Sequence, residues 1–167
     1  MPFDPDKLSF VDCELVKLRY DTHPMLREPH APQSSQYDLY QAVLPIEGRQ
    51  TVFVFLKVSG RVIGSEDRVL ARVEAYFRVL FVLENFAEVI THVPEGGGTV
   101  DADAMTAMLS IAASTMRGQL QVHLAKSPFG QLPLPVLTIA FIRTMPGFKP
   151  EEILTDWIGS AEAAHDE

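Results

Sequence analysis

The feature that most constrains the fold is the stretch at residues 69–83, in which every odd position is apolar. Charged side chains, Arg72, Glu74 and Arg78, fall on even positions between them. Because successive side chains of a β-strand point to opposite faces, a period of two predicts one long strand with a buried face. The apolar positions are Val69, Ala71, Val73, Ala75, Phe77, Val79, Phe81 and Leu83.

A second strand is predicted at residues 51–60, where Val52 and Val54 begin an alternation that continues to Val58. The opposite face of this strand carries Phe53 and Phe55, so both of its faces require cover. One subunit does not provide enough layers to cover both faces of the strand, so a partner subunit would supply the missing layer. We therefore expect a homo-oligomer.

Two further strands are expected at residues 8–20 and 37–44. In the first, the apolar phase slips by one position, which a β-bulge near Leu15 would explain. Short connectors between the later strands suit antiparallel hairpins, whereas residues 22–36, rich in Pro, His and Ser, predict a long crossing loop. The sheet should be four-stranded and antiparallel.

Helices are expected after the strands. Apolar residues at three-and-four spacing predict a long helix at residues 101–124, and Pro150 followed by an apolar stripe predicts a C-terminal helix at about 150–163. The fold class is α+β, with both helices packed on the sheet. We expect a single domain over residues 1–167, with a core at about 8–142.

Composition excludes several partners. A net charge of −8 disfavours nucleic acid, and no apolar run approaches the length that a bilayer demands, so membrane insertion is not expected. The N-terminus has no pattern of a secretory signal, which predicts a cytoplasmic location. Cys13, the single cysteine, fits buried packing in a strand.

No group of polar residues argues for catalysis. The five histidines lack metal-ligand spacing, and the glycines at 96–98 are followed by Asp101 and Asp103 where a phosphate would sit. We expect no enzyme activity, metal or cofactor. Two alternatives stay open: a small-ligand binder or enzyme using His123 or the histidines of the crossing loop, and a structural oligomer.

The segment at residues 128–137 is apolar but contains Pro128, Pro133 and Pro135, so it cannot be a central strand. Together with Arg117-Gly118 near the end of the long helix and Leu134-Pro135 beyond it, residues 111–139 resemble the SecB family of export chaperones and its SecB-like relatives. The order of elements over residues 8–142 is similar too.

The resemblance implies a dimer of dimers that acts as an ATP-independent holdase for unfolded polypeptides, serving protein export or protecting an antitoxin. The crossing loop and the Leu-Pro segment would border the client groove. The implied client-binding residues are Met25, Leu26, Phe129, Leu132 and Leu134. Export members also dock the translocase motor ATPase through acidic positions on the sheet, which correspond to Asp21 and Glu74, and Arg72 stands at a neighbouring position that is apolar in the family.

Overall fold

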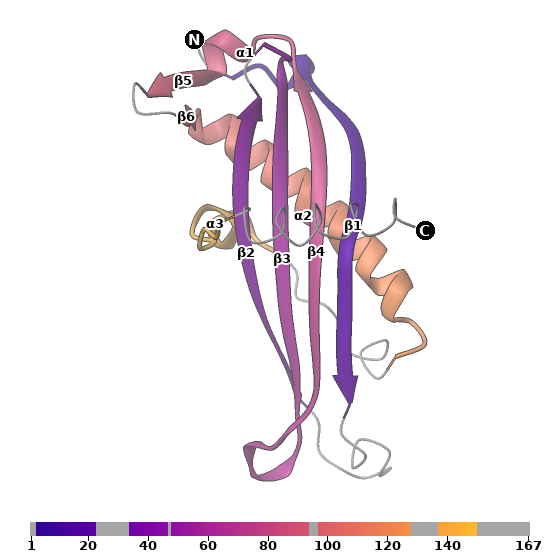
Figure 1. Ribbon diagram of the computed structural model, residues 1–167. Helices are drawn as coiled ribbons and strands as arrows, with labels where there is room; N and C mark the ends of the chain where they lie inside the picture. Colours follow the sequence, from indigo (N-terminus) through magenta and orange to yellow (C-terminus); the bar gives the residue numbers. More distant parts are fainter. Residues whose placement is uncertain (1–2, 23–33, 47, 94–96, 128–136, 150–167) are drawn as a thin grey trace, which may run out of the picture.

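The computed structural model describes residues 3–22, 34–46, 48–93, 97–127 and 137–149. Its framework is a four-stranded sheet of long strands in which every neighbouring pair is antiparallel (Figure 1). The strand order is β1-β4-β3-β2, so the first two strands of the chain form the two opposite edges. The strands are β1 (Leu8–Thr22), β2 (Ser34–Ile46), β3 (Thr51–Ile63) and β4 (Val69–Leu83). The predicted α+β fold class is confirmed.

The helical elements follow the sheet. A short helix α1 (Phe86–Val89) leads into a hairpin of β5 (Ile90–Val93) and β6 (Gly97–Val100), which precedes the long helix α2 (Ala102–Leu124) and the short helix α3 (Ile139–Arg143). Two 3₁₀ turns lie at Pro5–Lys7 and Ser65–Asp67. The C-terminal helix predicted at 150–163 lies outside the described residues. Within them, no helix combines the length and apolarity needed to cross a membrane.

The core lies between α2 and one face of the sheet, over which the helix runs obliquely (Figure 1). The odd positions of β4 and the even positions of β3 share this face, because Phe77 pairs with Leu56 and Phe81 pairs with Val52. The period of two in the sequence therefore marks the helix-covered face. The largest fully buried side chains of this core come from both layers: from the sheet Phe77, Phe81, Leu56 and Leu83, and from α2 Met108, Leu109, Leu120 and Leu124.

Strand β1 departs from a regular ladder at two places. Its register against β4 shifts between Leu15 and Lys17, as the slip in apolar phase predicts, and also between Phe10 and Asp12. Cys13 is buried between the two shifts, which confirms its role in packing. Burial, and then the neighbouring Asp12 carboxylate, raise the pKa of this thiol to about 11, so it is protonated at neutral pH.

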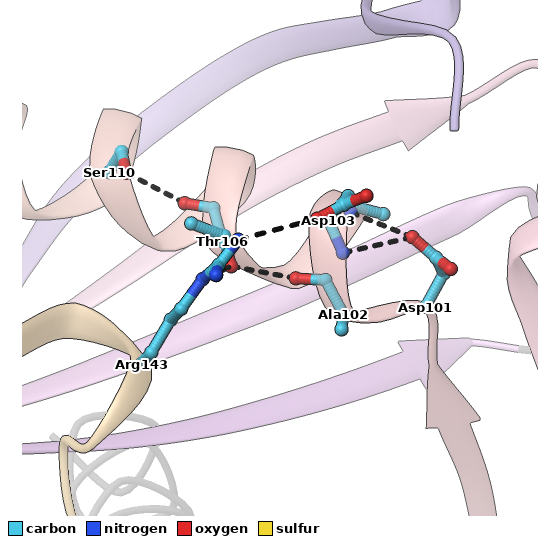
Figure 2. A network of polar contacts seen from close by, with 7 residues as sticks. Asp101, Ala102, Asp103, Thr106, Ser110 and Arg143 are labelled. Atoms are coloured by element: carbon cyan, nitrogen blue, oxygen red, sulfur yellow. Dashed lines mark hydrogen bonds and ion pairs between the residues drawn. The ribbon is translucent and has the colours of Figure 1, made fainter. Parts of the chain in front are cut away.

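The start of α2 is capped and joined to α3. The Asp101 carboxylate accepts hydrogen bonds from the backbone N–H groups of Asp103 and Ala104 at 3.0 and 3.1 Å, so it satisfies the donors that a phosphate would need (Figure 2). Arg143 of α3 reaches Asp103 at 3.4 Å and donates to the Thr106 hydroxyl at 3.4 Å. These contacts hold α3 against the first turns of α2.

The chain after α3 turns around an edge of the sheet. Gly147 forms a parallel bridge with Gln41 on β2, and the Phe148 ring lies 6.5 Å from the Tyr76 ring. Tyr76 belongs to the even positions of β4, which face away from α2. Phe53 and Phe55 share this second face, with ring centroids 6.1 Å apart. We call it the outer face of the sheet.

Candidate functional site

The residues expected to bind clients and partners fall into two groups. Met25, Leu26, Phe129, Leu132 and Leu134 lie outside the described residues, so the client groove stays a prediction. Asp21 and Glu74, the expected docking residues, both lie in described strands and line one cavity.

This cavity has a volume of about 530 Å³ and lies on the outer face, toward the β3–β4 hairpin. Three arginines and three carboxylates line it, with the backbone of β3 and β4 beneath them. The register brings these side chains together, since Asp21 pairs with Arg72 and Arg19 pairs with Glu74 across β1 and β4. The lining residues are Arg19, Asp21, Asp38, Ser59, Gly60, Arg61, Arg72, Val73 and Glu74; we call it the arginine cavity.

Two of the carboxylates in the arginine cavity contact arginines of the same cavity. Asp21 lies 4.0 Å from Arg19, two residues before it on the same face of β1. Asp38 on β2 lies 3.6 Å from Arg61 on β3. Both pairs are largely exposed, and such pairs contribute little to the free energy of folding. The pairs matter instead for the charge of the cavity, because each carboxylate is partly neutralised by the arginine that it contacts.

The third carboxylate, Glu74, belongs to a tighter cluster. It accepts a hydrogen bond of 2.6 Å from the Tyr76 hydroxyl and lies 3.3 Å from the Lys57 ammonium. That ammonium also lies over the rings of Tyr40 and Tyr76, 5.7 and 5.4 Å from their centroids. The hydrogen bond from Tyr76, with Lys57 adding to it, lowers the pKa of Glu74 despite partial burial.

The lowered pKa of Glu74 predicts a pH dependence of stability. A carboxylate with a lower pKa in the folded state stabilises it fully above the unfolded-state value of about 4.3, and this contribution is lost as the pH falls through the folded-state pKa. We therefore expect Glu74→Gln to lower the free energy of unfolding at pH 7, and we expect its difference from the wild type to shrink progressively as the pH falls below about 4. Urea unfolding at a series of pH values measures this.

The control for Glu74→Gln is Glu84→Gln, which removes an exposed carboxylate just beyond β4. This variant should lower the free energy of unfolding at pH 7 by less than Glu74→Gln does. A difference between Glu74→Gln and the wild type that does not shrink as the pH falls below about 4 would contradict the contact of Glu74 with Tyr76 and Lys57.

Arg72 differs from the other charged groups of the arginine cavity. It lies exposed on β4 and forms no ion pair with any side chain in the described part of the chain. Its neighbour on β3 is Arg61, directly opposite in the register, and its neighbour on β1 is Asp21, which contacts Arg19 instead. Like charges directly opposite each other on adjacent strands are destabilising.

Besides Leu44 on β2, apolar side chains are exposed on two other parts of the molecule. The edge strand β1 exposes Phe10, Val11 and Tyr20, with Val11 and Tyr20 each 51% exposed. The helices expose a second set, of which Val122 on α2 is the most accessible, at 76%. The others are Ile111 on α2 and Ile139 and Phe141 on α3. These residues are candidates for contact with another polypeptide.

No protein-family model matches the sequence. No curated protein sequence matches it either. The structure, in contrast, matches that of the Mycobacterium tuberculosis SecB-like chaperone Rv1957 in complex with a ChAD peptide from the antitoxin Rv1956 HigA1. The TM-score is 0.58 at 18% sequence identity, over 80% of this chain and 91% of that chain. The chain shares its fold with a SecB-like chaperone.

On this SecB-like fold, sequence reasoning identified only part of the arginine cavity. Asp21, Glu74 and the neighbouring Arg72 were named, but Arg19, Asp38 and Arg61 were not. The alternation along each strand does place these charged residues on the outer face. It does not give the register between strands, which decides which of them line one cavity. His123 is exposed on α2 and does not line the cavity. The described residues contain no group of three or more metal-binding side chains.

Proposed function

We propose that this chain is a holdase chaperone, which binds unfolded polypeptides by apolar contact without hydrolysing ATP and without catalysis. The observation that carries the proposal is the fold shared with a SecB-like chaperone whose structure contains a bound peptide. A holdase needs a surface for an extended chain rather than a set of reacting groups.

The exposed apolar side chains support the proposal physically. Burying one large apolar side chain in a complex contributes about 1.5–3 kcal/mol, so a few contacts give useful affinity for an unfolded chain. β1 offers such side chains beside an edge of the sheet, where an extended peptide can also form backbone hydrogen bonds. The predicted groove at residues 22–36 and 128–137 would add to this surface.

Oligomerisation is part of the proposal. Several weak apolar sites in one dimer of dimers raise the effective concentration for a long client, so that overall affinity exceeds that of any single site. Precursors for export and antitoxins are the two client classes that fit such a chaperone. A structural oligomer without chaperone activity is the competing explanation, and it requires that assembly hide the exposed apolar side chains.

The proposal is tested by following aggregation of a chemically unfolded model client by light scattering, with the purified chain added at increasing molar ratio. We expect suppression without nucleotide, unchanged when ATP is added, and a mass of the chaperone alone above that of one chain. Serum albumin at the same concentrations is the control. Full aggregation of the client with an intact oligomer present would favour the structural explanation, and a monomeric mass would contradict the assembly.

A further inference from the structure

The arginine cavity presents one charged group that is not satisfied within the described residues, Arg72. The three carboxylates around it already have contacts: Asp21 with Arg19, Asp38 with Arg61, and Glu74 with Lys57 and Tyr76. A cationic partner would have to compete with these contacts. An anionic partner would meet a guanidinium that is free to pair.

The geometry around Arg72 favours a carboxylate in particular. Arg61 and Arg72 stand directly opposite each other on β3 and β4, and Cβ atoms of such pairs are about 4.5–5.5 Å apart. Arg61 already contacts Asp38 at 3.6 Å and donates to the Gln36 amide oxygen at 3.5 Å, but a guanidinium has five N–H donors. The two oxygens of one carboxylate can therefore accept hydrogen bonds from Arg72 and from Arg61, which would bridge the two like charges. Arg19 lies in the same cavity on β1, where it contacts Asp21.

We propose that the arginine cavity docks a partner protein through an acidic segment, with an Asp or Glu side chain bound between Arg61 and Arg72. A volume of about 530 Å³ is much larger than one carboxylate and accommodates several residues of an extended peptide. The chain as a whole has a net charge of −8, so it repels acidic molecules at long range. Binding of an acidic peptide therefore requires a local site of this kind.

The test uses the full chain and three capped, fluorescently labelled peptides of equal length, rich in Glu, Gln or Lys. Fluorescence anisotropy should show that the Glu peptide binds most tightly and that its binding weakens with added salt. Arg72→Gln should weaken binding of the Glu peptide about tenfold, as loss of a charge-assisted hydrogen bond does. Arg72→Glu should abolish it.

The matched control is Arg49→Gln, which removes an exposed arginine from the β2–β3 turn, outside the arginine cavity, and should leave the affinity unchanged. Thermal unfolding of each variant checks the fold. Because Arg72 is exposed and lies opposite Arg61, we expect its substitution not to lower the melting temperature.

Several results would overturn the proposal. Equal affinity for the Glu and Gln peptides, or an unchanged affinity of Arg72→Gln for the Glu peptide, would show that no ionic contact with Arg72 holds the peptide. Preference for the Lys peptide would show that the carboxylates dock a basic partner. Binding that appears only after residues 150–167 are removed would identify the acidic C-terminal segment of this chain as the occupant, and self-association that depends on Arg72 would identify a second copy.

Discussion

Replacing Phe77 by alanine is expected to lower the free energy of unfolding by about 3–5 kcal/mol. Phe77 is fully buried on the helix-covered face of β4, where it pairs with Leu15 on β1 and Leu56 on β3. Its removal would leave a cavity at the centre of the sheet, which rigid neighbouring strands cannot fill by collapse. For a domain of this size, such a loss is a large fraction of the total stability.

Chemical denaturation at fixed protein concentration measures the Phe77→Ala effect, since dissociation of an oligomer would otherwise contribute to the transition. The matched control is Phe141→Ala on α3, where the ring is 39% exposed and a smaller loss is expected. Similar losses for the two variants would show that the helix-covered face of the sheet is not the main core.

The strands could be predicted because burial on one face leaves a period of two in the sequence. The strand predicted at residues 69–83 has the same bounds as β4 in the structure. The other strands extend beyond their predicted bounds, most clearly β2, which begins at Ser34 rather than residue 37. Backbone pairing continues there although the side chains are polar. A hydropathy pattern contains no information on backbone hydrogen bonds, so it does not predict this extension.

The β5–β6 hairpin was not predicted, because its second strand begins with glycines that read as a flexible connection. The structure supplies a packing reason for one of them. A Cβ atom on Gly98 would lie 3.0 Å from the Cγ2 atom of Ile90 on the paired strand. A glycine that permits such a close approach leaves no hydrophobic signal in the sequence.

The arginine cavity depends on register, which is a property of paired strands and not of any one of them. The pairing of Leu8 with Leu83, continued without a shift, would place Lys17 opposite Glu74. The two irregularities in β1 instead place Arg19 there, and Asp21 opposite Arg72. The sequence signalled the shift near Leu15 but not the earlier one, so the composition of the cavity could not be derived from it.

The double substitution Leu132→Ser and Leu134→Ser is expected to weaken client holding by about two orders of magnitude or more. Each leucine fully buried in a client complex contributes about 1.5–3 kcal/mol, and serine contributes none of it. Both residues lie outside the described part of the chain, so the expectation rests on sequence: Pro133 and Pro135 lack the N–H groups of a central strand, which places the leucines near the surface.

The competing explanation makes Leu132 and Leu134 ordinary core residues, in which case substitution would cost about 2–5 kcal/mol apiece in folding. Thermal unfolding of the double variant, measured beside its aggregation-suppression curve, separates the two. A groove role predicts a nearly unchanged melting temperature with a suppression curve shifted to much higher chaperone concentration. Leu44→Ser, at a 37% exposed position on β2 outside the predicted groove, is the control for loss of one accessible leucine. Early unfolding of the double variant, or full suppression by a stable one, would exclude these leucines from the groove.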